Sequence, residues 1–403
     1  MAIVKPFKAW RPQPDIVEEV ASVPYDVVNT EEAKKLAEGK PNSFLHVIRP
    51  EIDLPKNISL YHEKVYKKGQ ENLESLIRSE TFTQEKEDAL YLYRLTMEGI
   101  SQTGVFGCLS VEEYENEVIL KHELTRPDKE DDRTKHILTQ QAHAEPVMIT
   151  FKDSEQISDK MESIASSTKP IYDLETEDGI QHTVWKIENS SELETSFKKI
   201  SHLYIADGHH RCASAARAAK EKASQNPNHD GSEEYNFFPA VIFPMQQMKI
   251  LAYNRIIFSI PNDFLDKLDD SFHLIKDPKP RPVRKGEISL YLEGNWFGIR
   301  LETPESDDPA SSLDVSRLQQ QILGPILGIK DQRTDPNIDF VGGIRGTEEL
   351  EQIVDNGEAA LGISMFPTSI QELIDVSDAG QLMPPKSTWF EPKLRSGLLI
   401  HTF

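Results

Sequence analysis

The sequence predicts an α+β fold with mixed sheets. Short apolar runs bounded by Gly, Pro, Asn and Asp recur along the 403 residues, as expected of strands. Longer polar segments with apolar residues at helical spacing lie between them. Two of the apolar runs, at 89–95 and 104–109, are separated by a short polar stretch containing Gly99, as expected of a hairpin. Neither an internal repeat nor a low-complexity tract is evident.

The length suits two or three domains, and we expect three regions: 1–115, 116–260 and 261–403. In the first region, Asn29 or Thr30 caps a predicted helix that Gly39 stops. The elements predicted there are helices at 31–38 and 60–78 and strands at 44–48, 89–95 and 104–109.

In the middle region, acidic residues near Asp131 favour the start of a helix, and an apolar run after Pro146 favours a buried strand. The predicted strands there are 118–120, 146–151, 170–174, 181–187, 237–243 and 256–258, and the helices are 131–143, 155–165, 192–199 and 212–220. The last region is predicted to hold helices at 262–268, 315–323, 347–355 and 369–375 and strands at 288–292, 296–300, 339–341 and 360–363.

The composition excludes several classes of function. The formal net charge of −22 would repel phosphate backbones and anionic lipids, so neither nucleic acid nor membrane is an expected partner. No stretch approaches the ~18 apolar residues of a membrane span, and the beginning of the sequence lacks a signal-peptide pattern. Two cysteines cannot form a disulfide framework. We therefore expect a cytoplasmic protein.

The most informative segment is Asp207-Gly208-His209-His210-Arg211, which follows an apolar run and opens an alanine-rich helix. A strand that turns tightly into a helix gathers free backbone N–H groups at the positive end of the helix dipole, where anions bind. The guanidinium suits phosphate oxygens, the carboxylate suits magnesium, and a histidine can move protons. The alternative is an ordinary exposed turn.

Two further segments carry candidate residues. Glu123 follows a predicted strand and lies beside Lys121 and His122, so it could serve as a general base, or it could be an ordinary exposed glutamate. Near the end of the sequence, two prolines precede Lys386-Ser387-Thr388, whose side chains suit phosphate or carboxylate oxygens. The alternative there is a structural turn. Serine-hydrolase and zinc-protease motifs are absent from the sequence.

The segment at 207–211, with its strand and helix, resembles the phosphate-binding motif of the ParB/sulfiredoxin superfamily, and most closely its free-serine kinase branch. In that branch a His-Glu pair leads through a helix to a Pro-apolar strand, an order matched here by His122-Glu123, 132–143 and Pro146. The whole chain also resembles the bacterial family named domain of unknown function 1015, on segments that include 23–26, 49–51 and 385–388.

The resemblance implies a ParB/sulfiredoxin-like catalytic core at 116–260, flanked by N- and C-terminal α/β extensions. It also implies a phosphotransferase that uses ATP or ADP and Mg²⁺ to phosphorylate a small hydroxyl compound, with free L-serine favoured. Gly208, His209, His210 and Arg211 would bind the phosphates together with Lys386, Ser387 and Thr388. Asp207 would hold magnesium or orient the nucleophile, His209 would assist catalysis, and Glu123 would be the base.

Two other functions remain open on the sequence. One is a ParB-like protein that binds and hydrolyses a nucleotide as a switch, although the acidic charge argues against DNA as its partner. The other is a non-catalytic metabolite-binding protein that keeps the turn for structure. A sulfiredoxin-like activity would need a cysteine within the motif, where this chain has His209.

Overall fold

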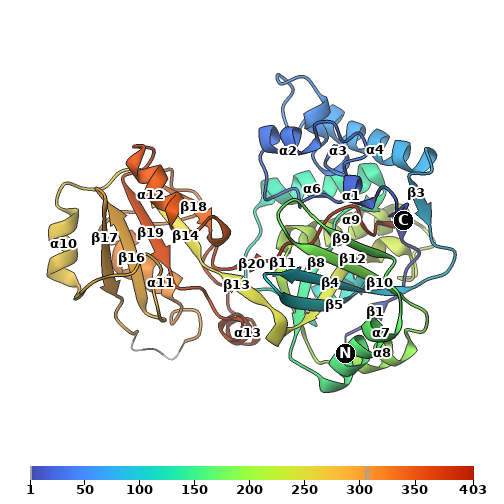
Figure 1. Cartoon of the computed structure of the whole chain (residues 1–403). Helices are drawn as coiled ribbons and strands as arrows, with labels where there is room; N and C mark the ends of the chain where they lie inside the picture. Colours follow the sequence, from blue (N-terminus) through green and yellow to red (C-terminus); the bar gives the residue numbers. More distant parts are fainter. Residues whose placement is uncertain (1, 305, 307) are drawn as a thin grey trace. The chain divides into compact units, whose positions relative to one another are not determined.

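The computed structural model describes residues 2–304, 306 and 308–403, which form two compact units (Figure 1). Unit 1 comprises 1–121, 125–248 and 392–403, and unit 2 comprises 122–124 and 249–391. The chain therefore leaves unit 1, forms most of unit 2 and returns to unit 1 for its last segment. The α+β class with mixed sheets is confirmed, whereas the three regions expected from the sequence stay a prediction.

Among the described residues, unit 1 contains a nine-stranded mixed sheet with the order β6-β11-β8-β12-β5-β4-β10-β9, and β1 pairs with β5 beside this path. The pairs β6–β11 and β8–β12 are parallel, and the others are antiparallel. The strands of unit 1 are β1 (Val4–Lys5), β2 (Trp10–Pro12), β3 (Phe82–Gln84), β4 (Leu90–Met97), β5 (Ile100–Ser110), β6 (Ile119–Leu120), β7 (Ala142–His143), β8 (Val147–Phe151), β9 (Tyr172–Glu175), β10 (Gln181–Ile187), β11 (Leu203–Asp207), β12 (Phe237–Pro244) and β21 (His401–Thr402).

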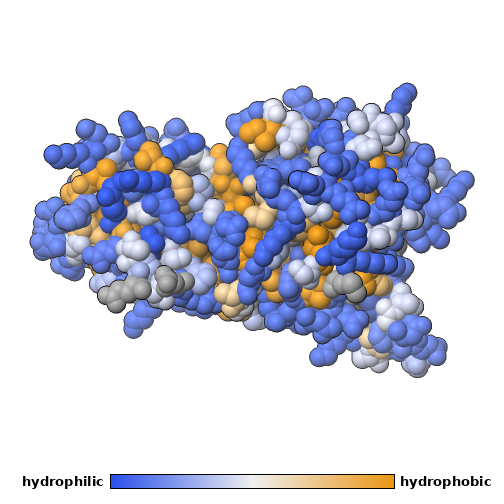
Figure 2. Space-filling view, turned by 90° about the horizontal axis from the view of Figure 1, so that it is seen from below, coloured by the Kyte–Doolittle hydropathy of each residue, from blue (hydrophilic) through white to orange (hydrophobic). Residues whose placement is uncertain are grey.

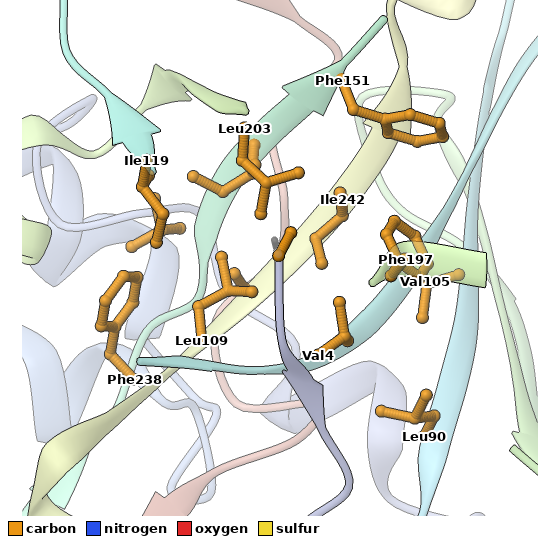
Figure 3. Packing of buried hydrophobic residues seen from close by; sticks show 14 of the residues in the cluster. Val4, Leu90, Val105, Leu109, Ile119, Phe151, Phe197, Leu203, Phe238 and Ile242 are labelled. Atoms are coloured by element: carbon orange, nitrogen blue, oxygen red, sulfur yellow. The ribbon is translucent and has the colours of Figure 1, made fainter. Parts of the chain in front are cut away.

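Apolar side chains from this sheet and from several helices build the main core of unit 1. Figure 3 shows labelled members from β1, β5, β6, β8, β11 and β12 pointing toward one another. Apolar residues of α7, α8 and α9 join this cluster, and a second cluster gathers around α2, α3 and α4. The helices of unit 1 are α1 (Val17–Val20), α2 (Thr30–Ala37), α3 (Leu45–Ile48), α4 (Glu63–Arg78), α5 (Val111–Glu115), α6 (Pro127–Gln140), α7 (Glu155–Ser167), α8 (Ser191–Phe197) and α9 (His209–Gln225), with short 3-10 turns η1 (Pro50–Asp53), η2 (Glu234–Asn236) and η3 (Met245–Gln247).

The described part of unit 2 is organised around a six-stranded antiparallel sheet, with the order β15-β17-β16-β19-β14-β18. Strands β13 and β20 form a separate pair. The elements are β13 (Lys249–Leu251), β14 (Tyr253–Ile257), β15 (Leu274–Ile275), β16 (Glu287–Leu292), β17 (Asn295–Arg300), β18 (Ile338–Gly342), β19 (Leu361–Met365), β20 (Trp389–Glu391), α10 (Phe264–Ser271), α11 (Asp314–Leu318), α12 (Glu348–Asp355), α13 (Ile370–Asp378), the π-helical turn η4 (Gln319–Leu323) and the 3-10 turn η5 (Gly343–Arg345).

Local sequence explains many of these elements. Asn29 caps α2 in a capping box with Glu32, so two backbone N–H groups at the helix start gain partners. The β4–β5 hairpin turns through Glu98 and Gly99, both at positive φ, as its tight turn requires. Prediction and structure agree at both places.

One predicted strand is wrong. Residues 44–48 begin with Phe44 as a helix cap and continue as α3, with Leu45, Val47 and Ile48 buried in the second core cluster. A short apolar run shows no period that separates a buried strand from a buried helical turn. Helix α6 also begins earlier than expected, at Pro127, since proline suits the first position of a helix.

On the face shown in Figure 2, hydrophilic residues cover most of the surface. This fits a sequence with 67 acidic and 45 basic residues. Among the described residues, no helix combines the length and apolar character needed to cross a bilayer.

Candidate functional site

The segment that stands out in the sequence forms a strand–turn–helix unit in unit 1. Strand β11 ends at Asp207, Gly208 is the N-cap in a left-handed conformation (φ +103°), and α9 begins at His209. Among the residues that the structure describes, no side chain caps the helix. The first backbone N–H groups of an α-helix have no intrahelical acceptor, and the helix dipole adds positive potential there. The start of α9 therefore has the properties of an anion site.

A β-bulge lies just before the turn. The pairing of β11 with β8 changes register between Ile205 and Asp207, and such a bulge redirects the following side chain. The residue after Asp207, Gly208, must be glycine. A Cβ on Gly208 would lie 3.0 Å from Arg211 Nε and 3.3 Å from Val147 Cγ1, in a backbone conformation that L-residues rarely adopt.

Asp207 lies between two cations. Its Oδ2 atom is 3.4 Å from Lys393 Nζ and 3.4 Å from the Arg211 guanidinium. Burial by itself would raise the pKa of this carboxyl, but the charges of Lys393, Arg211 and His209 outweigh that effect and hold its pKa well below its usual range. Asp207 is therefore a permanent carboxylate at neutral pH, able to accept hydrogen bonds or bind a cation.

Arg211 is buried and held from several sides. Its guanidinium donates to the backbone carbonyl of Pro146 and lies 3.9 Å from Asp26 Oδ2. Its Nε atom is buried and has no hydrogen-bond partner among the described residues. Arg211, Arg133 and Glu145 are among the residues that line a small cavity of about 40 Å³. That volume suffices for a buried water molecule.

A carboxylate of this cavity, Glu145, ties together segments that are distant in sequence. Its Oε1 atom accepts hydrogen bonds from the backbone N–H of Tyr25 (3.0 Å) and from the Ser396 hydroxyl (3.1 Å). Burial raises the pKa of Glu145, against the opposing influence of Arg211 and Arg133. The Arg133 guanidinium also lies over the Tyr25 ring at 4.1 Å. This network fixes the loop that carries Asp26.

The two histidines of the motif differ in their surroundings. His209 is the buried first residue of α9, and its charge contributes to the low pKa of Asp207. His210 accepts a hydrogen bond at Nε2 from the backbone N–H of Arg126 (3.0 Å), the residue before α6. The bond joins the starts of α6 and α9, and it requires His210 Nε2 to carry no proton.

Glu123 belongs to unit 2. The short segment that carries it is fixed by a hydrogen bond from the Met383 N–H to the His122 carbonyl (2.7 Å). Its side chain lines a pocket of about 260 Å³ together with Lys330 and Gln332. The structure thus gathers Asp207 to Arg211 in unit 1 and places Glu123 in unit 2.

Lys386, Ser387 and Thr388 also lie in unit 2, before β20. Lys386 has positive φ, and its ammonium lies 5.3 Å from the centre of the Tyr253 ring. Ser387 is buried and donates its hydroxyl proton to the Pro384 carbonyl at 2.6 Å, which closes the turn. Their role in nucleotide binding stays a prediction.

Sequence reasoning missed Lys393 and Glu145 and gave Asp26 little weight. A sequence signal existed for two of them, because Asp26 follows a Val-Pro-Tyr turn and Glu145 directly precedes Pro146. Lys393 lies two residues after β20 and reaches Asp207 only through the return of the chain to unit 1.

Within the described residues, no group of three or more His, Cys, Asp or Glu side chains is arranged to hold a metal ion. Magnesium often binds through one or two carboxylates and completes its shell with phosphates and water. Asp207 fits that mode as a single protein ligand.

A family model described as "Protein of unknown function (DUF1015)" matches residues 4–316. No curated protein matches the chain significantly. Similar solved structures include a free serine kinase in complex with AMP, with 13% identity and a TM-score of 0.40 over 73% of this chain and 91% of that chain. A conserved hypothetical protein from Pyrococcus furiosus has 15% identity and a TM-score of 0.38 over 73% and 95%. C-terminally truncated SbnI from Staphylococcus aureus has 13% identity and a TM-score of 0.38 over 71% and 82%.

Proposed function

The chain belongs to the DUF1015 family of proteins of unknown function, and we propose that it is a small-molecule kinase. It transfers a phosphoryl group from ATP or ADP to a hydroxyl, with free L-serine as the favoured acceptor. The observation that carries the proposal is the cluster at the start of α9, where a permanent carboxylate, Asp207, lies between Lys393 and Arg211. Uncapped helix N–H groups beside paired cations suit transferable phosphates.

The charge balance of this cluster supports a role for magnesium. Asp207 and Asp26 carry two negative charges beside the two positive charges of Lys393 and Arg211. Even when His209, whose charge also acts on Asp207, is counted, the net positive charge of these groups is smaller than the negative charge of a nucleotide di- or triphosphate, so further positive charge is needed. Mg²⁺ held by Asp207 would supply it and would stabilise the charge that develops during phosphoryl transfer.

The proposed reaction combines phosphoryl transfer with removal of a proton from the acceptor hydroxyl. The serine hydroxyl oxygen forms a bond to the terminal phosphorus, while the bond from that phosphorus to the bridging oxygen breaks and leaves ADP, or AMP when ADP is the donor. Glu123 is the proposed base that takes the hydroxyl proton. Gly208, His209, His210 and Arg211 surround the phosphates, and Lys386, Ser387 and Thr388 are proposed as further contacts to the nucleotide.

The direct test incubates the full chain with Mg²⁺, L-serine and either ATP or ADP and measures O-phosphoserine by mass spectrometry. Glu123→Ala should reduce turnover at least ~100-fold, since general base catalysis contributes about 10²–10⁴. The exposed Glu115→Ala is the matched control and should behave as wild type. Full turnover in Glu123→Ala would show that another group is the base.

Nucleotide binding is tested separately by thermal denaturation. ADP or ATP with Mg²⁺ should raise the Tm of the wild-type chain, because a ligand that binds only the folded state stabilises it. A shift without phosphoserine formation would indicate a nucleotide-dependent switch instead, and the absence of any shift would indicate a non-catalytic protein.

A further inference from the structure

The charged groups at the start of α9 come from three segments of unit 1 that are far apart in the sequence. One is the loop at 21–29 between α1 and α2, the Asp26 loop, and another is the β11–α9 turn itself. The third is the C-terminal segment at 392–403, which carries Lys393. A cluster assembled in this way keeps its geometry only where other contacts fix the segments relative to one another.

Glu145 and Pro146, which lie just before β8, contact all three segments. Glu145 Oε1 accepts hydrogen bonds from the N–H of Tyr25 in the Asp26 loop (3.0 Å) and from the hydroxyl of Ser396 in the C-terminal segment (3.1 Å). The Pro146 carbonyl accepts a hydrogen bond from the Arg211 guanidinium. Strand β8 is paired on both sides, with β11 and β12, so the residues before it form a fixed point for the cluster.

The two oxygens of the Glu145 carboxylate have different surroundings. Oε1 accepts both bonds, whereas Oε2 lies 4.0 Å from Arg133 Nη1. Glu145 is 9% exposed, and a buried carboxylate needs hydrogen bonds and a nearby cation to offset its desolvation. An amide cannot satisfy both sides, because its NH2 group would face either the Arg133 cation or the two donors. The position therefore favours a carboxylate.

The C-terminal segment also has contacts that do not involve Glu145. The Ser22 and Ser396 backbones pair through two hydrogen bonds, at 3.1 and 2.8 Å. The Arg395 N–H donates to the Tyr93 hydroxyl at 3.1 Å. Removal of the Ser396 hydroxyl therefore weakens the attachment to Glu145 and leaves the backbone path of the segment in place.

We propose that Glu145 is a positioning residue for the charge cluster at the start of α9. Through the Asp26 loop, it keeps the Asp26 carboxylate beside Arg211. Through the C-terminal segment, it keeps Lys393 beside Asp207. The consequence for phosphate binding rests on the proposed function, whereas the link between the segments rests on the hydrogen bonds of Glu145.

Amide hydrogen exchange and calorimetric titration of the full chain with ADP and Mg²⁺ test this role. In Glu145→Gln the amides at 24–27 and 393–400 should exchange on the order of tenfold faster, because two hydrogen bonds to a charged group are weakened. In Ser396→Ala the faster exchange should be confined to 393–400. The Kd for ADP should rise on the order of tenfold in Glu145→Gln and by less in Ser396→Ala.

Two variants serve as matched controls. Glu87→Gln replaces an exposed glutamate of unit 1. Ser196→Ala removes a buried hydroxyl that donates to the Glu192 carbonyl within α8 (2.9 Å). Both should keep the wild-type exchange in the two segments and the wild-type affinity for ADP. A merely structural role of Glu145 would lower the stability of unit 1 as a whole without changing the local exchange or the ADP affinity of the folded chain.

Unchanged exchange of the two segments in both Glu145→Gln and Ser396→Ala would overturn the proposal. Faster local exchange with the wild-type affinity for ADP would overturn it as well, because the cluster would then not depend on Glu145. If the wild-type chain binds no ADP, the proposed function fails, while faster exchange in both segments still supports the link through Glu145. If Glu145→Gln unfolds, fast exchange throughout the chain reveals it, and Ser396→Ala alone decides the outcome.

Discussion

Replacing Gly208 with alanine should damage the proposed phosphate site more than the fold. Gly208 adopts φ +103°, a region that costs an L-residue roughly 1–2 kcal/mol or more. The added Cβ would also lie 3.0 Å from Arg211 Nε and 3.2 Å from its Cζ atom. Arg211 is held by the Pro146 carbonyl and must shift by a few tenths of an ångström to make room. We expect a total loss of about 1–3 kcal/mol in unfolding free energy.

The chain offers a control that separates backbone strain from the displacement of Arg211. Gly231 has a similar φ of +92° and lies in a surface loop, and no atom of the described residues comes within 4 Å of the position that a Cβ would occupy. Both alanine variants incur backbone strain. Only in Gly208→Ala should the Arg211 guanidinium and the first turn of α9 be displaced from the proposed phosphate site.

The assay pairs chemical denaturation with calorimetric titration of ADP in the presence of Mg²⁺. Gly231→Ala should lose some stability and keep the wild-type affinity. In Gly208→Ala the affinity for ADP should fall on the order of tenfold or more, since each tenfold step corresponds to about 1.4 kcal/mol. Equal ADP affinities in wild type and both variants would refute the assignment of this turn as the phosphate site.

Three further predictions concern the same region. Asp207→Asn should abolish phosphoserine formation. The pKa of Asp207 is lowered in the folded state, so its carboxylate stabilises the fold above the unfolded pKa of about 3.9. This stabilisation fades as the pH falls through the folded pKa. The difference in unfolding free energy between wild type and Asp207→Asn, from urea titrations, should therefore shrink below pH ~4. Lys393→Met should remove the strongest of the positive influences on Asp207 and weaken ADP binding in the same calorimetric assay, whereas Lys8→Met, at an exposed lysine of unit 1, should not. Cys212 is buried and burial raises its pKa to about 12, so a thiol reagent should label it only after denaturant is added, and rapid labelling of the native chain would contradict its burial.

The parts of the fold that follow from local sequence were predictable. The capping box at Asn29 and the hairpin turn at Gly99 depend on neighbouring residues, and both occur as expected. The segment at 44–48 was not predictable in this way. Its apolar side chains are compatible with a strand or a helical turn, and packing against α4 decides the outcome.

The same distinction holds for the candidate site. Asp207 to Arg211 are contiguous, so strand, turn, helix start and charges could all be read from one segment. Lys393 is separated from Asp207 by 186 residues, and no local pattern links the two. Glu123 belongs to unit 2, although the residues on both sides of its short segment belong to unit 1. This assignment likewise depends on tertiary contacts.

The return of the chain to unit 1 also explains why Lys393 is well placed to act on Asp207. The Ser396 hydroxyl donates to Glu145, the Trp10 and Ile400 backbones pair, and β21 pairs with β7, so the last segment is fixed at several points that follow its lysine. An exposed lysine loses much side-chain conformational entropy when it is held in one ion pair. A lysine on a fixed segment loses less, so more of the electrostatic attraction between the paired groups remains. The positive charge beside Asp207 is therefore a product of the tertiary fold, and the proposed phosphate site is electrostatically complete only when the 392–403 segment has docked.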